Sequence, residues 1–300
     1  MKLPHPIPYQ GSKRNLASSI LAVVGARRVR CFYEPFAGSA AITIAAASAG
    51  LSQKYVIGDS LEPLTRLWQE ILFSPERISG AYADIWNAQH DDHEDYYAKV
   101  RSRFNELGAP SDLLFLLVRC VKNSPRWNRA GQFNQSADLR RSGMNPVKMT
   151  REINGAHFLL KGKTEVTCGD FEETIARAGS TDVVYMDPPY EGTSGSRDTR
   201  YHQGLSRDRL ILVLKDLNRR GVPWLLSYDG RCGDKSYGTP LPLSLKATRL
   251  DLIAGRSTQA TLNGVAATTV ESLYASSEFG KVTCPQPEQM PIWRNLEMLA

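Results

Sequence analysis

The chain has 300 residues, of which 42% are hydrophobic, and a formal net charge of +6. Such a chain can bury a full core and form one or two domains. No apolar run approaches the roughly 20 residues of a membrane span, and the first residues hold no hydrophobic signal core, so we expect a cytoplasmic protein without membrane association. The five cysteines are scattered without a C-x-x-C pair, so neither disulfides nor a metal site is predicted.

The positive charge is concentrated in one segment. Residues 121–163 contain nine basic and two acidic residues, a net charge of +7, so the rest of the chain sums to about −1. A basic patch of this kind predicts a polyanionic partner. The alternative is a solvated surface loop in which like charges cluster by chance.

The N-terminal segment is rich in turn residues. Residues 7–13 read Ile-Pro-Tyr-Gln-Gly-Ser-Lys, so Tyr9 and Lys13 flank a glycine turn that suits an anionic group. An apolar-periodic helix follows and stops near Gly25. Taken alone, this entry segment is a weak indication of a binding site.

A strand, a glycine-bearing turn and a helix come next. Residues 29–36 predict the strand, Gly38 lies in the turn, and residues 41–49 form a helix of small side chains closed by Gly50. This order begins a nucleotide-binding α/β sheet, because small residues let a ligand approach the backbone at the helix N-terminus. No G-x-G-x-x-G motif is present, so a dinucleotide is not the expected ligand.

The second strand ends in an acid. Residues 54–58 predict the strand and Asp59 follows at its end. An acid in this place can accept hydrogen bonds from both hydroxyl groups of a ribose. The alternative is that Asp59 caps the next helix, but Ser60 can serve as the cap instead, so we favour the ribose role.

A long helical stretch then interrupts the alternation of strands and helices. Apolar spacing predicts helices from residue 61 to about 120, with Ser74 and Pro75 starting one helix and Ser111 capping another. A loop-like segment at residues 123–134 follows. It mixes Arg, Asn, Gln and aromatic residues, which are the side chains that contact base edges and phosphates.

The strand pattern resumes after this insert, with strands predicted at residues 164–168, 182–186, 222–228, 245–252 and 268–274. Asp170 and Glu173 form a capping-box pattern, and Phe171 is placed to cover a bound ring. Residues 191–203 are polar and contain glycine, which predicts a mobile loop. Ser206 is expected to cap the helix that precedes the fifth strand.

The motif Asp187-Pro188-Pro189-Tyr190 directly follows the strand at residues 182–186. Neither proline has an N–H group and each has a fixed φ, so the backbone carbonyls are rigidly oriented. The acid and a carbonyl can accept the two N–H donors of an amino group on a planar ring, while the tyrosine stacks on the ring. The alternative is a strand-ending turn with a surface tyrosine.

With these motifs in this order, the chain resembles the alpha-class, Dam-like DNA adenine-N6 methyltransferases, which use S-adenosylmethionine. The resemblance runs from residue 7 to about residue 274. It rests on five matches: residues 9–13 with the aromatic-x-Gly-x-Lys element, 34–38 with the E-P-F-x-G loop, 58–59 with the ribose-binding acid, 126–134 with R-x-N-x-x-G-x-F-N, and 187–190 with the catalytic motif. The family often has a second glycine where this chain has Ala40.

The resemblance implies an α/β fold: a Rossmann-like methyltransferase sheet, mostly parallel with a late antiparallel strand, and an inserted helical recognition domain. Residues 1–60 and 164–277 would form the catalytic domain and residues 61–163 the domain that recognises DNA. Residues 278–300 would form a polar tail along the surface.

The resemblance also implies sites for S-adenosylmethionine. Lys13 and Tyr9 would hold its amino-acid end, Asp59 its ribose, and Phe171 would lie against its adenine. The full set of expected cofactor-binding residues is Tyr9, Lys13, Glu34, Pro35, Phe36, Ala37, Gly38, Asp59, Asp170, Phe171 and Asp187.

The expected catalytic residues are Asp187, Pro188, Pro189 and Tyr190. An adenine amino nitrogen is a poor nucleophile because its lone pair is delocalised into the ring. Hydrogen bonds to the Asp187 carboxylate and the Pro188 carbonyl would make this nitrogen more tetrahedral and direct its lone pair at the methyl group. Tyr190 would stack on a base swung out of the duplex.

Double-stranded DNA is the expected partner, and a partner restriction nuclease is a further candidate; we expect a monomer or weak dimer. The expected DNA-binding residues are Lys122, Arg126, Asn128, Arg129, Gln132, Asn134, Arg140, Arg141 and Lys148. Three alternatives share the fold: an RNA adenine methyltransferase, a DNA cytosine-N4 methyltransferase, and a DNA-binding relative without catalysis. Asp187 argues against the first two, since RNA enzymes often carry Asn there and cytosine enzymes commonly Ser.

Overall fold

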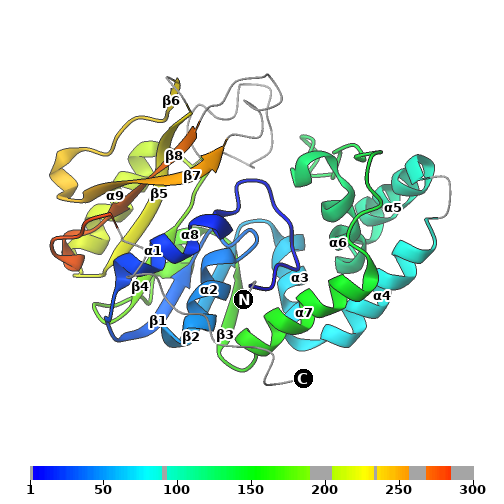
Figure 1. Cartoon of the computed structure of the whole chain (residues 1–300), viewed down its shortest axis with the longest axis horizontal. Coiled ribbons are helices and arrows are strands. Elements are labelled where there is room, and N and C mark those ends of the chain that lie inside the picture. The colour runs from blue at the N-terminus through cyan, green and yellow to red at the C-terminus, as the bar shows by residue number, and fades with distance from the viewer. Residues whose placement is uncertain (1–2, 90–92, 190–204, 233–234, 257–267, 285–300) are drawn as a thin grey trace.

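The computed structural model describes residues 3–89, 93–189, 205–232, 235–256 and 268–284. Figure 1 shows helices α1 (Ala17–Val24), α2 (Ala41–Ala49), α3 (Glu62–Phe73), α4 (Pro75–Asn87), α5 (His93–Leu107), α6 (Pro110–Arg119), α7 (Pro146–Leu160), α8 (Phe171–Ile175) and α9 (Arg207–Arg219). The strands are β1 (Val29–Glu34), β2 (Ser52–Asp59), β3 (Thr164–Cys168), β4 (Val183–Met186), β5 (Trp224–Cys232), β6 (Lys235–Tyr237), β7 (Thr248–Arg256) and β8 (Thr268–Ala275). Short 3-10 helices are η1 (Lys13–Leu16), η2 (Val121–Asn123), η3 (Leu243–Leu245) and η4 (Ser277–Phe279).

The strands form one sheet in the order β3-β2-β1-β4-β5-β8-β7, and β6 pairs with β5. Strands β3, β2, β1, β4 and β5 are parallel to one another, and β8 runs antiparallel to both β5 and β7. The expected fold class, a mostly parallel Rossmann-like sheet with a late antiparallel strand, is therefore confirmed.

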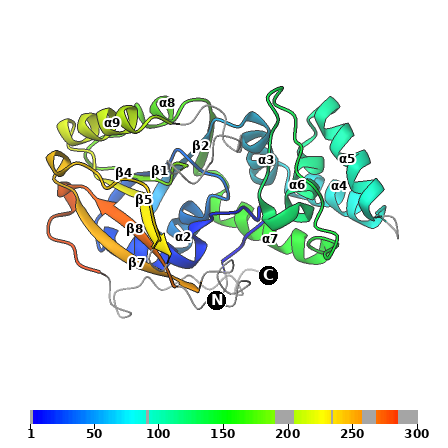
Figure 2. The same cartoon turned by 90° about the horizontal axis from the view of Figure 1, so that it is seen from above.

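Helices cover both faces of the sheet, as Figure 2 shows, with α8 and α9 on one side and α2 on the other. Successive residues of a strand point to opposite faces, and β1 illustrates the consequence. Phe32 joins the core beneath α1 and α2, whereas Tyr33 joins the core beneath α8 and α9. Burial on both faces explains why β4, in the middle of the sheet, is continuously apolar in sequence.

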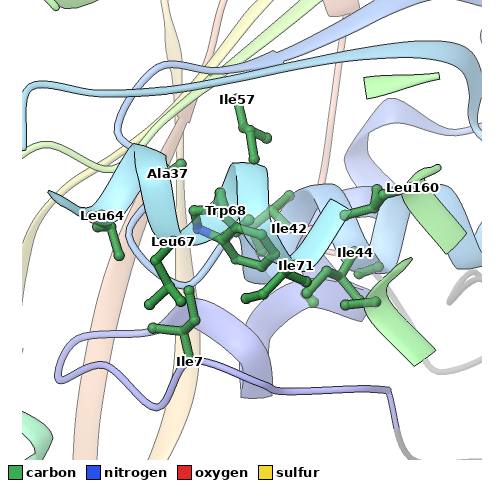
Figure 3. Packing of buried hydrophobic residues seen from close by; sticks show 14 of the residues in the cluster. Ile7, Ala37, Ile42, Ile44, Ile57, Leu64, Leu67, Trp68, Ile71 and Leu160 are labelled. Atoms are coloured by element: carbon green, nitrogen blue, oxygen red, sulfur yellow. The ribbon is translucent and has the colours of Figure 1, made fainter. Parts of the chain in front are cut away.

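The larger core is continuous from the sheet into α3 and α7 (Figure 3). Leu64, Leu67, Trp68 and Ile71 recur at helical spacing along α3 and are each at most 1% exposed. Burial of each such aliphatic side chain contributes about 1.5–3 kcal/mol. The N-terminal segment joins the same core through Ile7, which is fully buried.

Helices α4, α5 and α6 lie on the side of α3 away from the sheet (Figure 1). Helix α7 returns the chain to the sheet by packing against α2, α3 and α4. The sequence analysis assigned no individual helix to the residues of α7, although it placed them in the expected helical insert. The start of α7 has a clear local cause, because the Asn145 side chain accepts a hydrogen bond from the amide of Lys148 and Pro146 occupies the first turn.

The start of α6 and the presence of β6 also differ from the prediction. Helix α6 begins at Pro110 and its N-cap is Ala109, so Ser111 is not the cap. The short strand β6 was not anticipated. The loop expected at residues 191–203 and most of the expected polar tail, residues 285–300, lie outside the described residues.

Within the described ranges, the structure contains no helix with enough length and apolar character to cross a membrane.

Candidate active site

The strand order reverses between β1 and β4, and the segments that follow these strands carry two of the sequence motifs. Gly38 lies in the turn between β1 and α2, and Asp187 directly follows β4. In sheets of this type, ligands bind outside the carboxyl ends of the strands at such a reversal. The fold therefore brings together two motifs that are far apart in the sequence.

The predicted catalytic motif lies at the carboxyl end of β4. The side chain of Asp187 is 20% exposed, Pro188 is buried and Pro189 is half-buried. The buried strand residues before it, up to Met186, anchor the motif in the sheet. Tyr190 lies outside the described residues, so its predicted stacking role stays a prediction.

Lys13 contacts the predicted catalytic carboxylate. Its Nζ lies 3.0 Å from Oδ1 of Asp187 and 3.7 Å from Oε2 of Glu271, and its side chain is only 8% exposed. It also donates a hydrogen bond to the carbonyl oxygen of Gly11 at 3.2 Å. The sequence analysis expected Lys13 at the amino-acid end of a cofactor, whereas the structure places its ammonium between two carboxylates.

Glu34 is a buried carboxylate at the end of β1. Its Oε2 accepts hydrogen bonds from the amide and the hydroxyl of Thr43, so the side chain stabilises the first turn of α2. Burial raises the pKa of Glu34 to about 7, and the nearby charge of Asp187 acts in the same direction, against the Thr43 hydrogen bonds.

The carboxylate of Asp59 organises the turn after β1. Its Oδ2 accepts a hydrogen bond from the amide of Gly38 at 3.1 Å, and its Oδ1 accepts one from the amide of Leu61 at 3.0 Å. Burial raises the pKa of Asp59, while these two amides act against the rise. Helix α3 has Leu61 as its N-cap, so Asp59 precedes the cap and links the two turns at the predicted ribose site.

The turn itself has an unusual backbone at Ala40. This residue has φ 47° and ψ 35°, in the left-handed region, which costs a residue with a side chain about 1–2 kcal/mol. A hydroxyl contact between Ser39 and Ser12 at 2.8 Å and a hydrogen bond from the indole of Trp68 to the Gly38 carbonyl hold the turn in place. The turn thus keeps a conformation that glycine would adopt without strain.

The remaining residues of this loop form its floor and wall. Pro35 and Ala37 are buried, while Phe36 and Gly38 are half-buried. Tyr9 packs against the larger core and lies beside Gly38, where an added Cβ would be 3.8 Å from its ring. The structure therefore brings Tyr9 close to the 34–38 loop, two parts of the predicted cofactor site.

Phe171 and Asp170 lie at the start of α8. Phe171 is 5% exposed and stacks on Phe36 with 5.1 Å between ring centroids. Asp170 caps α8 through the amide of Glu172, and it also forms an ion pair of 2.7 Å with Arg209, whose guanidinium lies over the Phe171 ring. The capping alternative for Asp170 is thus realised in the structure.

The predicted DNA-binding motif at residues 126–134 forms a compact hairpin. Trp127 and Phe133 face each other across it and are 4% and 1% exposed. The side chain of Asn128 accepts hydrogen bonds from the amides of Ala130 and Gln132 and so shapes the tip. Asn128 therefore has a structural role that the motif did not disclose.

Most of the predicted DNA-binding side chains are exposed: Lys122, Arg126, Arg129, Gln132, Asn134, Arg140, Arg141 and Lys148. Two of them share one acid. Asp138 is buried and pairs with Arg140 at 2.9 Å and with Arg141 at 3.0 Å. The hydrogen bonds from Arg140 lower the pKa of Asp138 to about 2. The ionised Asp138 carboxylate therefore holds both arginine side chains at the surface of this loop.

The 3-10 helix η2, which precedes the hairpin, is joined to the N-terminal segment by a backbone hydrogen bond. The amide of Gln10 donates a hydrogen bond to the carbonyl oxygen of Asn123 at 2.9 Å. Lys122 and Asn123 both have positive φ values, 57° and 50°. Two consecutive left-handed residues with side chains raise the conformational energy of the backbone. The hydrogen bond from Gln10 lies at the second of these two residues.

Sequence reasoning missed Glu271 and the polar pair Tyr185 and Ser227. Glu271 lies on β8, and the hydroxyls of Tyr185 and Ser227 are 3.0 Å apart below the site. An acid within the otherwise apolar and small pattern of residues 268–275 was the available signal. It could not be interpreted because the pairing of β8 with β5 was unknown.

Comparisons with known proteins identify the family of the chain. The family model of the D12 class N6 adenine-specific DNA methyltransferases matches residues 9–255. The chain is 27% identical over 234 residues to the type II methyltransferase M1.LlaDCHI of Lactococcus lactis subsp. cremoris, covering 73% of this chain and 78% of the relative. It is 26% identical over 207 residues to a DNA adenine methylase of Salmonella typhi, covering 66% and 71%.

A third relative is much longer. The chain is 31% identical over 144 residues to a DNA N-6-adenine-methyltransferase of Escherichia phage P1, which covers 45% of this chain and 19% of that protein.

Proposed function

Since this chain belongs to the D12 class N6 adenine-specific DNA methyltransferases, we propose that S-adenosylmethionine is its methyl donor and that Asp187 binds the target adenine. One observation carries the proposal: Asp187 lies at the carboxyl end of β4, beside the Gly38 turn, where the strand order reverses. This arrangement brings a target amino group and a methyl donor to the same edge of the sheet. Asp187 is also the residue that argues against the RNA and cytosine alternatives.

The residues present fit a donor with a positively charged sulfonium group. Asp187 and Glu271 both form ion pairs with Lys13. Glu34 lies close enough to Asp187 for the negative charge of Asp187 to raise the pKa of Glu34. Three carboxylates against one ammonium leave a local excess of negative charge when all are ionised, which stabilises a cation. When bound, S-adenosylmethionine would supply an electrophilic methyl group.

We assign the donor's contacts to the residues around the Gly38 turn. Asp59 would accept hydrogen bonds from the ribose, and Phe171 with Phe36 would line the place of the adenine. Tyr9 and the loop at residues 34–38 would contact the methionine portion. Asp170 would act from the rim, where it already holds Arg209.

Asp187 and the carbonyl of Pro188 would accept the two N–H groups of the target adenine. These two acceptors would make the amino nitrogen more tetrahedral and hold its lone pair toward the methyl group. Tyr190 would stack on the flipped base. The buried position of Pro188 and the fixed φ of both prolines support a preorganised geometry.

Residues 61–163 would form the DNA-recognition domain, inserted between catalytic segments 1–60 and 164–277. The exposed side chains of the hairpin and of the Arg140 loop support this division. Arg140, Arg141 and Lys148 would contact phosphates, and Arg126 and Arg129 would contact bases. We also propose a monomer or weak dimer acting in the cytoplasm on double-stranded DNA, with a restriction nuclease as a candidate partner. The similarity to a type II methyltransferase supports the last point.

The test uses purified protein, labelled S-adenosylmethionine and plasmid DNA, followed by mapping of the methylated base. The wild-type protein should label N6 of adenine. Asp187→Ala should nearly abolish transfer, at about 3 kcal/mol or more for one lost acceptor, while its thermal unfolding stays near that of the wild type because the side chain lies at the edge of the core. Near-wild-type turnover of Asp187→Ala would refute the assigned role, and an inactive wild-type protein that still binds DNA would favour the noncatalytic alternative.

A further inference from the structure

Four groups on four elements surround the Asp187 carboxylate. Lys13 comes from η1, Glu34 from β1, Glu271 from β8 and Tyr185 from β4. The ammonium of Lys13 contacts Asp187 and Glu271 directly. Burial raises the pKa of the Tyr185 phenol, and the negative charges of all three carboxylates act in the same direction. The ammonium of Lys13 therefore offsets part of the negative charge of a group of carboxylates, those of Asp187, Glu271 and Glu34.

The position of Glu271 is set by strand pairing. Glu271 lies opposite Gly230 of β5 and Leu252 of β7. Side chains directly opposite each other in an antiparallel pair share a face, and Leu252 and Leu273 mark this face as the one that carries α1 and α2. Since neither cross-strand neighbour bears a charge, the carboxylate is directed to a site where η1 supplies one.

A bulge in β5 is part of this geometry. The register between β5 and β8 shifts between Ser227 and Gly230. A Cβ added to Gly230 would lie 2.6 Å from the carbonyl oxygen of Val270, so the close pairing beside Glu271 requires glycine. Because Gly230 has no side chain, the β5 position directly opposite Glu271 contributes none.

We propose that Glu271 is a positioning residue for the catalytic carboxylate. The inference rests on the proposed function. By sharing the Lys13 ammonium, Glu271 keeps it at Oδ1 of Asp187 and limits the strength of the Lys13–Asp187 pair. Asp187 is then held ionised and oriented, yet remains a good acceptor for the target amino group.

Charge-removing variants test this proposal through the pH dependence of kcat. Lys13→Met removes the cation, so the acid limb of the kcat profile should move up by about one pH unit or more. Glu271→Gln leaves the cation to Asp187 alone, so the limb should move down and kcat at the plateau should fall about tenfold as the reacting group loses its fixed position. The double variant should bring the limb back toward its wild-type position, because removal of the cation and removal of the anion move it in opposite directions.

The matched control is Asp251→Asn. Asp251 lies on β7, one strand away, is exposed, and pairs with Arg249 on the opposite face. Like Glu271→Gln, the Asp251→Asn substitution removes one negative charge from the neighbouring part of the sheet, and it should leave kcat and its pH profile unchanged. Thermal unfolding and calorimetric binding of S-adenosylmethionine should be measured for every variant. Affinity for the donor should weaken in Glu271→Gln, which removes one of the carboxylates that stabilise a cation, so kcat is compared at saturating S-adenosylmethionine.

Several results would overturn the inference. Unchanged kcat in Glu271→Gln would do so, as would limbs that move in the same direction in both single variants. A Lys13→Met protein with weakened cofactor binding and an unmoved limb would assign Lys13 to the donor instead. All of these outcomes require an active wild-type protein, so they are distinct from a failure of the proposed function, in which the wild type would not methylate adenine.

Discussion

At the residue scale, Glu34 joins stability to the chemistry of the site. Its carboxylate is 3% exposed and is bound by Thr43 at the start of α2. Burial raises its pKa from an ordinary value of 4.5 to about 7. Between these two values the folded protein holds a proton that the unfolded chain has released, so the free energy of unfolding contributed by Glu34 falls as the pH rises from 4.5 through 7.

Glu34→Gln should remove this pH dependence, because an amide does not titrate in this range, and its oxygen can still accept the Thr43 hydrogen bonds. The difference in unfolding free energy between the variant and the wild type should shift in favour of the variant between pH 5 and pH 8, by up to about 3 kcal/mol. Urea unfolding at both pH values measures it. A difference that is the same at both would mean that Glu34 ionises in the folded protein as in the unfolded chain.

Asp59 has two functions to separate. Its oxygens already accept the amides of Gly38 and Leu61, so Asp59→Ala should lower the melting temperature as well as weaken S-adenosylmethionine binding, the latter by roughly 1.5–3 kcal/mol. DNA binding measured without cofactor should change little. Unchanged cofactor affinity with a lower melting temperature would reduce Asp59 to a residue that organises the turns.

At the scale of elements, the hairpin at residues 126–134 presents its polar side chains from a rigid base. Trp127 and Phe133 pack edge to face with 5.4 Å between centroids, and both contact Phe104 of α5. Arg126 and Arg129 are exposed above this aromatic cluster. An ordered base favours directional contacts to bases, whereas the loop that carries Arg140 presents charge.

The two arginine sets should differ in salt dependence. Each phosphate contact contributes about −0.9 to the slope of log affinity against log salt, so Arg140→Ala with Arg141→Ala should flatten the slope by up to about 2 and weaken all duplexes alike. Arg126→Ala or Arg129→Ala should reduce methylation of the cognate site more than general binding, by about 1–3 kcal/mol. Filter binding over a salt series, with cognate and scrambled duplexes, measures both.

A suitable control is Arg219→Ala, which removes an exposed arginine that is also paired with an aspartate, Asp216, on α9. It should change neither slope nor affinity. If the Arg126 and Arg129 variants lose affinity equally on both duplexes, they contact the backbone. If none of the four arginines matters, the basic segment is only a solvated surface.

At the scale of the whole molecule, the sequence predicted what depends on local pattern. The strands other than β6, the Asp170 and Ser206 caps and the two motifs at the strand reversal could be read from periodicity and turn residues. The start of α6 was wrong because proline at Pro110 fits the first turn better than Ser111 fits the cap.

Contacts between distant segments could not be predicted in this way. Glu271 faces Lys13 only because β8 inserts between β5 and β7 and a bulge adjusts its register. Asn128 was assigned to DNA by its motif, but its carboxamide shapes the hairpin. A residue type and a spacing do not reveal which of several hydrogen-bond partners a side chain will meet.

The hydrogen bond between Gln10 and Asn123 makes the N-terminal segment a short link between two parts of the molecule. The segment is bound to the helical insert at Gln10 and to the predicted catalytic carboxylate at Lys13. From Gln10 to Lys13 the chain advances three residues, which span at most about 10 Å, so the link has little freedom to extend. If the insert shifts to follow a wrong base pair, the link must either break its hydrogen bond or pull the ammonium away from Asp187. Errors in reading DNA would then be penalised in the speed of methyl transfer, even where the duplex stays bound.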